Sequence, residues 1–255
     1  MSGPLRAAIF DVDGTLVDSE RHGHRVAFNR AFEEFDLPYR WDETIYGELL
    51  HTTGGQRRIE GYLAAQGVPE DGRSDLAGKL HVRKTEILEQ LVDDGVIEVR
   101  PGVARLLEQL VVDGVALAVG TTGSRRWVER LLRRMLPEVR WDVVVTGDDV
   151  TARKPDPEVF TRALAGLGLH GPAGAVIVED SAEGLAAACA AGVPCAVVVN
   201  GYTADHDLAG ADLVVHGFGE PWAPAGVMAD PHGTGCDGIL TADLLRTLSQ
   251  CRSTA

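Results

Sequence analysis

The sequence lacks any long apolar run. Every hydrophobic stretch in its 255 residues is interrupted by polar residues well short of the ~20 residues that a membrane-spanning helix needs. We therefore expect no transmembrane segment. The first ten residues also lack the apolar segment of a secretory signal peptide, because their short apolar run leads directly into two acids. No signal peptide is expected.

Cysteines are few, and none is spaced as metal-binding or redox-active cysteines usually are. The four (Cys189, Cys195, Cys236 and Cys251) form no CxxC pair and no Cys/His ligand pattern. Reduced thiols are typical of the reducing compartments of a cell. The sequence therefore predicts a cytoplasmic protein without structural zinc or a disulfide framework.

Basic residues are also in short supply. The 24 lysines and arginines face 38 acids, which gives a net charge of −14. A protein this acidic binds polyanions poorly, so we expect no nucleic-acid partner. Separately, we expect a monomer. Five arginines between residues 125 and 134 resemble a basic stripe, but apolar residues such as Trp127 and Leu131 alternate with them. This pattern is typical of the solvent-facing side of an amphipathic helix.

Short apolar runs recur along the chain and are typical of strands buried on both faces. They cover residues 7–10, 115–119, 143–145, 175–178 and 195–199. Helical patterns lie between the later runs, at residues 103–112, 125–135, 158–167 and 182–191. This alternation predicts an α/β fold with a Rossmann-like parallel sheet.

Residues 20–98 interrupt this rhythm, because they carry helical periodicity without a convincing strand. We interpret residues 19–98 as an inserted α-helical cap domain, and residues 1–18 with 99–255 as the α/β catalytic core. Near the end, the Gly- and Pro-rich segment Gly217–Gly238 predicts a surface loop before a last helix over 242–248. Gly233–Gly238 fits GxGxxG, but it follows no predicted strand and is interpreted as a loop.

Polar side chains follow the predicted strands at the point where each strand ends. They are Asp11 and Asp13 after the first run, Thr121 and Thr122 after the second, Lys154 beyond the third, and Glu179 and Asp180 after the fourth. The carboxyl ends of parallel strands meet at one edge of a sheet, where such folds bind their ligands. We therefore expect these residues to converge.

This set of residues suits phosphoryl transfer. Two carboxylates 4 Å apart repel by about 4 kcal/mol at an effective dielectric constant of 20, and Mg²⁺ among them offsets the repulsion. A carboxylate held beside Mg²⁺ can attack phosphorus, while Lys154 and the Thr121 hydroxyl stabilise the phosphoryl oxygens. Asp13, two residues beyond Asp11, can protonate the leaving oxygen and later activate water.

The segments DVDGTLVDSE, GTT, KPDPEVF and VEDSAEGLAAACAAGV together resemble the haloacid dehalogenase superfamily of phosphatases over essentially the whole chain. The resemblance implies Asp11 as the nucleophile and Asp13 as the general acid and base. It implies phosphate binding by Thr121, with Thr122 beside it, and by Lys154. It also implies Mg²⁺ held by Asp11, the main-chain carbonyl of Asp13, and Asp180, with Glu179 nearby.

The insert is similar to the CbbY subgroup in its stretches ERHGHRVAFNRAF, YGELLHTTGGQRRI and LHVRKTEI. That resemblance implies a role in carbon fixation (the Calvin cycle) and hydrolysis of the 1-phosphate of xylulose-1,5-bisphosphate. It implies sugar-phosphate contacts by Asp18, Arg58, His81 and Lys84. His81 and Lys84 are three residues apart and share one face of a helix. The chain departs from the subgroup at Gln56, where a lysine is usual.

Other functions stay open at this point. Within the same superfamily, phosphoglycolate phosphatase and β-phosphoglucomutase are alternatives. Outside the enzymes, a phosphate-sensing module like a receiver domain would also carry a phosphorylated aspartate. In a receiver domain that aspartate follows a strand in the middle of the sequence, so the position of Asp11 after the first strand of the chain argues against a receiver domain.

Overall fold

A computed structural model describes residues 4–52 and 54–251. Met1–Gly3, Thr53 of the predicted cap, and residues 252–255 lie outside the described residues. The chain forms two compact units, which are treated separately below. Unit 1 combines the segment up to Asp18 with the segment from Val99 onward, and unit 2 is Ser19–Glu98. That these units act as a catalytic core and a cap stays a prediction.

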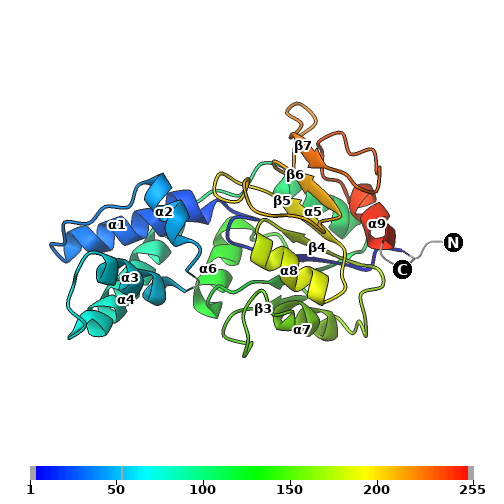
Figure 1. The fold of residues 1–255 in the computed structure, drawn as a ribbon. Coiled ribbons are helices and arrows are strands. Elements are labelled where there is room, and N and C mark those ends of the chain that lie inside the picture. Colours follow the sequence, from blue (N-terminus) through cyan, green and yellow to red (C-terminus); the bar gives the residue numbers. More distant parts are fainter. Residues whose placement is uncertain (1–3, 53, 252–255) are drawn as a thin grey trace. The chain divides into compact units, whose positions relative to one another are not determined.

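Unit 1 is built on a mostly parallel sheet, which confirms the predicted α/β class (Figure 1). The strand order is β3-β2-β1-β4-β5-β6-β7, and only β7 runs antiparallel to its neighbour. The strands are β1 (Ala7–Phe10), β2 (Ala116–Gly120), β3 (Val143–Val145), β4 (Ala175–Glu179), β5 (Cys195–Val198), β6 (Leu213–Val215) and β7 (Val227–Ala229).

Strand β1 lies in the middle of the sheet, between β2 and β4. All four of its side chains are fully buried, as its unbroken apolar sequence predicts. Ala7 pairs in register with Ala116 of β2 and Ala175 of β4, and Phe10 pairs with Val119 and Val178. The carboxyl ends of these three strands therefore lie side by side at one edge of the sheet.

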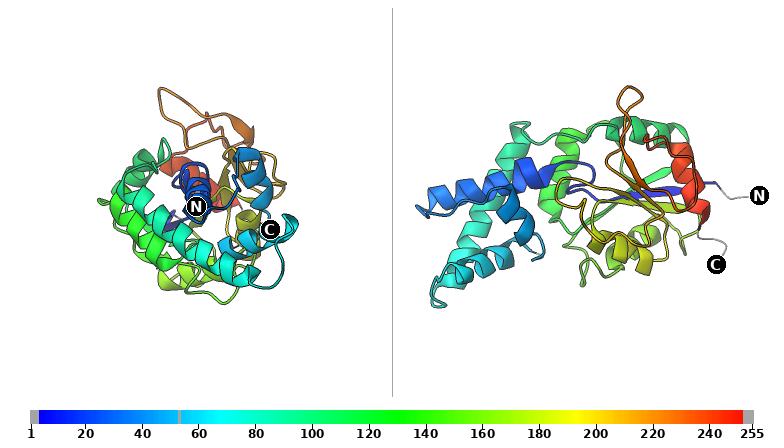
Figure 2. Two further views of the ribbon diagram at one scale, coloured as in Figure 1. Left: turned by 90° about the vertical axis from the view of Figure 1, so that its left-hand side faces the viewer. Right: turned by 45° about the horizontal axis from the view of Figure 1, so that its top comes forward.

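Helices cover both faces of this sheet (Figures 1 and 2). One layer holds α7 and α8, which contact each other, and the other holds α5 and α9. Ile9 packs with Phe160 of α7 in the core beneath the first layer, whereas Phe10 points the other way and contacts Trp141. The helices of unit 1 are α5 (Val103–Val112), α6 (Arg125–Met135), α7 (Glu158–Gly166), α8 (Ala182–Ala190) and α9 (Ala242–Cys251).

The prediction that Gly217–Gly238 is only a surface loop is wrong in part. Strand β7 lies inside this segment and pairs with β6, a strand that the sequence pattern also did not reveal. Each strand has three residues, and the side chains of β7 are exposed, so no buried apolar run marks it. Main-chain pairing alone defines β7. Gly233–Gly238 forms no helix or strand, as predicted.

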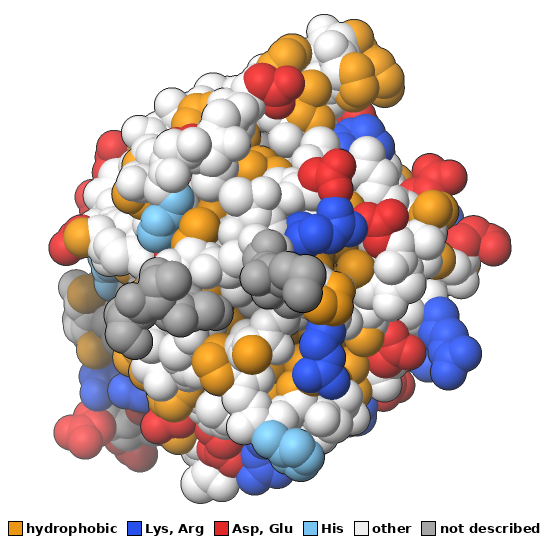
Figure 3. Space-filling model, turned by 90° about the vertical axis from the view of Figure 1, so that its right-hand side faces the viewer, with side chains coloured by type: hydrophobic (Ala, Val, Ile, Leu, Met, Phe, Trp, Pro, Cys, Tyr) orange, Lys and Arg blue, Asp and Glu red, His pale blue; other side chains and the backbone are white. Residues whose placement is uncertain are grey.

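The surface of unit 1 is mixed in character. β7 is an edge strand, and Trp222 in the preceding loop is 81% exposed. On the side where α9 lies, hydrophobic, acidic and basic side chains are interspersed (Figure 3).

On α6, the apolar residues Trp127, Val128, Leu131 and Leu132 are buried, whereas Arg133 and Arg134 are exposed, which confirms the amphipathic interpretation. Among the described residues, no helix combines the length and hydropathy needed to cross a bilayer.

Unit 2 is helical in its described part, as expected. A π-helical turn, η1 (Glu20–His24), leads into α1 (Arg25–Glu34), α2 (Glu43–Leu49), α3 (Gly55–Ala65) and α4 (Arg73–Asp93). Helix α4 packs against α1 and α3. Aromatic rings fill the space between these helices, and Phe28 and Trp41 have ring centroids 4.7 Å apart. Asn29 fixes the Trp41 main chain by accepting from its N–H (2.7 Å) and donating to its carbonyl (2.8 Å).

We expect Asn29→Ala to lower the free energy of unfolding by about 2–4 kcal/mol, because two buried backbone groups of Trp41 would lose their partners. Asn29→Asp keeps the acceptor oxygen but loses the donor, so we expect a smaller loss. Urea unfolding of the three proteins measures both effects. Equal stability of all three would contradict this role for Asn29.

Candidate active site

Asp11 lies directly after β1 and is buried, with 6% of its surface exposed. Its N–H donates to the Val178 carbonyl (3.0 Å), which continues the strand pairing and fixes the backbone. Lys154 donates from Nζ to Asp11 Oδ1 (2.6 Å) and to Glu179 Oε1 (2.5 Å). The ammonium also lies 4.8 Å from the centre of the Phe160 ring. One buried cation therefore joins carboxylates from β1 and β4.

Glu179 ends β4, and the start of α8 holds its second oxygen. Oε2 accepts from the N–H groups of Asp180 (2.8 Å) and Ser181 (3.2 Å). A Cβ atom at Gly184 would lie 1.9 Å from the Glu179 carboxyl carbon, so this position in α8 requires glycine. Both Glu179 oxygens thus accept hydrogen bonds from protein groups, and the side chain connects Lys154 to the backbone before α8.

Asp180 is held by two polar side chains from different parts of the chain. Thr15 donates to Oδ1 (3.1 Å), and Asn200, just after β5, donates to Oδ2 (2.7 Å). Gly14 also lies against this carboxylate, because a Cβ there would come within 2.5 Å of Oδ2. Its φ of +84° adds a second reason for glycine. The loop after β1 is therefore fitted closely to Asp180.

Burial and nearby negative charges raise the pKa of Asp11 and of Asp180. Burial, together with repulsion from Glu179 and Asp13, outweighs the attraction of Lys154 and raises the pKa of Asp11 to about 7. Burial and the charges of Glu179 and Asp11 raise the pKa of Asp180 well above its usual range. Burial disfavours the charged ammonium of Lys154, but Asp11 and Glu179 outweigh that effect and raise its pKa. Lys154 is therefore charged at neutral pH, but its single positive charge faces three carboxyl groups.

This cluster fits a divalent cation. Asp11, Glu179 and Asp180 each offer a carboxylate oxygen, and these atoms all lie within 4.8 Å of one another. Hard cations prefer such oxygen ligands, and a divalent cation here would favour the charged carboxylates, which burial and mutual repulsion disfavour. The predicted convergence of the polar strand ends is thus met for Asp11, Lys154, Glu179 and Asp180.

Asp13 and the threonines lie around this cluster. The half-buried Asp13 accepts a hydrogen bond at Oδ2 from Trp127 Nε1 of α6 (3.3 Å). Thr121 follows β2 and is 1% exposed, and its Oγ1 accepts from the Gly123 N–H (3.2 Å). Within the described part of the chain its hydroxyl donates to no protein group, so the proton is available to a ligand. Thr122 is half-buried, and its carbonyl lies beside Gly147.

The four predicted sugar-phosphate residues belong to different units. Asp18 is in unit 1, and Arg58, His81 and Lys84 are in unit 2. Arg58 donates to the Leu49 carbonyl (3.0 Å) and to the Tyr46 hydroxyl (3.3 Å).

Lys84 and His81 lie on α4 in different surroundings. Lys84 Nζ lies 2.5 Å from His24 Nδ1 and 4.8 Å from the centre of the Phe28 ring. The His81 ring lies beside Gly55, where a Cβ would come within 2.8 Å of Nδ1. Their binding role stays a prediction.

Three residues of this site were not predicted from the sequence. Asn200 follows the apolar run of β5, and the rule that identified Glu179 and Asp180 would have found it. Trp127 was interpreted only as a core residue of α6, but its indole also contacts Asp13. Arg100 donates to the Gly14 carbonyl (2.5 Å) across 86 residues of sequence, and no local pattern signals that contact.

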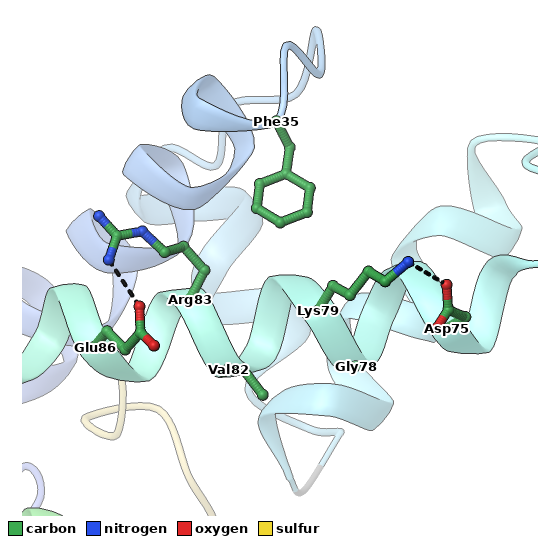
Figure 4. Close-up of a pocket in the computed structure, with 7 residues that line it drawn as sticks. All are labelled: Phe35, Asp75, Gly78, Lys79, Val82, Arg83 and Glu86. Atoms are coloured by element: carbon green, nitrogen blue, oxygen red, sulfur yellow. Dashed lines mark hydrogen bonds and ion pairs between the residues drawn. The ribbon is translucent and has the colours of Figure 1, made fainter.

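A separate shallow pocket of about 550 Å³ lies on unit 2 (Figure 4). Phe35 and residues of α4 line it. Its cations are already paired, Lys79 with Asp75 (2.7 Å) and Arg83 with Glu86 (2.8 Å). This pocket holds no acid cluster of the kind found in unit 1 and offers no comparable site for phosphoryl chemistry.

The raised pKa of Asp11 predicts a pH-dependent penalty on folding when no divalent cation is present. The unfolded chain releases this proton near pH 4, but the folded protein holds it until about pH 7, so stability falls as pH rises between these values. We expect Asp11→Asn to be more stable than the wild type at pH 8, with a smaller margin at pH 5. Thermal unfolding in a chelator measures this.

Asp207→Asn, at an exposed loop position, serves as the control and should leave the pH dependence unchanged. If the stability of the wild type and of Asp11→Asn depended on pH in the same way, the pKa of Asp11 would not be raised in the folded protein.

Comparison with known proteins is consistent with this site. A family model described as haloacid dehalogenase-like hydrolase matches residues 8–198. The chain is 42% identical over 223 residues to a "CBBY-like protein" of Arabidopsis thaliana, a match that covers 84% of this chain and 70% of the relative. It is 39% identical to "Protein CbbY" of Cereibacter sphaeroides, with 88% and 96% covered.

A solved structure extends the comparison to the fold. It is a variant of CbbY from Rhodobacter sphaeroides in complex with xylulose-(1,5)bisphosphate, 38% identical to this chain. The TM-score is 0.74, and the match covers 84% of this chain and 94% of the other. The chain therefore belongs to the haloacid dehalogenase-like hydrolases, among which it is similar to the CbbY proteins.

Proposed function

We propose that this phosphatase hydrolyses a small sugar phosphate through an aspartyl-phosphate intermediate on Asp11, with xylulose-1,5-bisphosphate as the preferred substrate. The observation that carries the proposal is the buried Asp11 carboxylate, held 2.6 Å from Lys154 Nζ within a cluster of three acids. The related CbbY structure with xylulose-(1,5)bisphosphate supports the choice of substrate.

In the first step an Asp11 carboxylate oxygen attacks the phosphorus of the substrate. The new P–O bond forms on Asp11 as the bond from phosphorus to the sugar oxygen breaks, and Asp13 gives its proton to that oxygen. Lys154 and the Thr121 hydroxyl hold the phosphoryl oxygens during the transfer, with Thr122 beside them. Trp127, by donating to Asp13 Oδ2, keeps the general acid beside the reacting group.

In the second step water attacks the phosphorus of the phosphorylated Asp11. Asp13, now a carboxylate, takes a proton from this water, and inorganic phosphate leaves as the Asp11 carboxylate is restored. We assign Mg²⁺ to Asp11, Asp180 and the main-chain carbonyl of Asp13, with Glu179 bracing the set. When bound, Mg²⁺ neutralises charge on the phosphoryl oxygens and orients them.

The remainder of the substrate needs its own contacts. By similarity to the CbbY subgroup we assign them to Asp18, Arg58, His81 and Lys84. In a chain of net charge −14, the basic residues among these supply local positive charge for a second phosphate group. Turnover of such a soluble metabolite suits a cytoplasmic enzyme of carbon fixation.

Asp11→Asn should reduce phosphate release from xylulose-1,5-bisphosphate by at least a thousandfold, because the amide cannot attack phosphorus. Asp13→Asn should reduce it about 10²–10⁴-fold through loss of acid–base catalysis. Inorganic phosphate assayed with Mg²⁺, with Asp207→Asn as a control, measures both losses.

Equal rates for the wild type and Asp11→Asn would exclude the mechanism. A panel including phosphoglycolate and β-glucose 1-phosphate tests the substrate. Turnover that needs an activating bisphosphate and yields no free phosphate would identify a mutase instead.

Lys84→Gln should raise KM for xylulose-1,5-bisphosphate about tenfold or more, because a charge-assisted contact with phosphate is worth roughly 1.5–3 kcal/mol. The KM for p-nitrophenyl phosphate, which has no second phosphate, should stay unchanged. Lys79→Gln is the matched control, since Lys79 lies on the same helix with 63% of its side chain exposed. A uniform loss of activity on both substrates would indicate a structural role for Lys84.

A further inference from the structure

Arg100 connects three separate segments of unit 1 through one side chain. The chain enters unit 1 for the second time at Val99, and the Arg100 N–H donates to the Leu16 carbonyl (2.9 Å). Its guanidinium donates to the carbonyls of Gly14 (2.5 Å), Val198 (2.9 Å), Val199 (2.7 Å) and His216 (3.4 Å). These acceptors belong to the loop after β1, the end of β5 and the residue after β6.

The acceptors of Arg100 are unusual for a half-buried cation. Among the described residues, no carboxylate lies within ion-pair distance of it, and its hydrogen bonds go to main-chain carbonyls. Burial lowers the pKa of the guanidinium, while the more distant charges of Asp180 and Asp18 oppose that effect. The planar fork of an arginine suits several fixed acceptors at once, which a lysine cannot match.

The Gly14 contact links Arg100 to the acid cluster. Gly14 follows Asp13 directly and is packed against Asp180 Oδ2. Asn200 donates to Asp180 Oδ2 (2.7 Å) and also approaches the Gly14 carbonyl (3.4 Å). Arg100 and Asn200 thus hold the same carbonyl, and Asn200 holds the carboxylate beside it. This pair therefore connects the Asp13–Gly14 main chain to Asp180.

We infer that Arg100 is a positioning residue for the cation site, because it fixes the Asp13–Gly14 main chain beside Asp180. This inference rests on the proposed function, in which the Asp13 carbonyl and Asp180 both bind Mg²⁺. Groups behind the ligands of a metal commonly change its affinity 10–100-fold when removed. The charge of Arg100 acts in the opposite sense, since a nearby cation repels Mg²⁺. Positioning and charge therefore predict opposite effects of its removal.

The test is the dissociation constant of Mg²⁺, measured by calorimetry on the full chain without substrate. We expect Arg100→Met to weaken Mg²⁺ binding about tenfold or more. Arg105→Met is the matched control. Arg105 donates to the Leu240 (3.0 Å), Phe218 (3.2 Å) and Gly219 (2.8 Å) carbonyls in the tail loops but not to the loop after β1. The Arg105→Met variant should be less stable than the wild type but should bind Mg²⁺ with the wild-type affinity.

Arg100→Lys keeps the charge and loses the fork, so it should also weaken binding, and it serves if Arg100→Met does not fold. In both Arg100 variants excess Mg²⁺ should restore kcat towards the wild-type value, which a general structural defect would not allow. Wild-type or tighter Mg²⁺ binding in the Arg100 variants overturns the inference and leaves the proposed function intact. Failure of the wild type to bind Mg²⁺ overturns the proposed function itself.

Discussion

The site depends on the contact of one ammonium, Lys154, with two buried carboxylates, Asp11 (2.6 Å) and Glu179 (2.5 Å). Without it, three acids within 4.8 Å of one another would have no cation at ion-pair distance among the described residues. Repulsion of about 4 kcal/mol for each pair at 4 Å is a large share of the 5–15 kcal/mol that stabilises a typical domain. The start of α8, Thr15 and Asn200 add hydrogen bonds from uncharged donors to these carboxylates.

The sheet is what brings these groups together. Asp11 is separated from Lys154 by 143 residues and Thr15 from Asp180 by 165, so no local structure can form either contact. Because β1 lies between β2 and β4 in register, Asp11 lies between the strand that leads to Thr121 and the strand that ends at Glu179. Burial of apolar side chains on both faces fixes that register. The register in turn determines which polar side chains lie next to one another at the strand ends.

Much of unit 1 could be predicted because its candidate site residues follow apolar runs, as Asp11 and Glu179 do. The same signal fails for β7, whose exposed side chains carry no apolar pattern and which exists only through pairing with β6. It also fails for Arg100 and Trp127, because their partners, Gly14 and Asp13, lie 86 and 114 residues away. Sequence periodicity describes which face of an element is buried and carries no information about such long-range polar contacts.

The incomplete compensation of charge has a functional meaning. Asp11, Glu179, Asp180 and the neighbouring Asp13 carry four formal negative charges, two more than the positive charges of Lys154 and the half-buried Arg100, in keeping with the raised pKa of Asp11 and Asp180. A divalent cation would balance this excess, so a phosphate group would meet less repulsion at the site. A third fixed cation, in place of Asn200, would balance part of this charge, but it would compete with a divalent cation for Asp180.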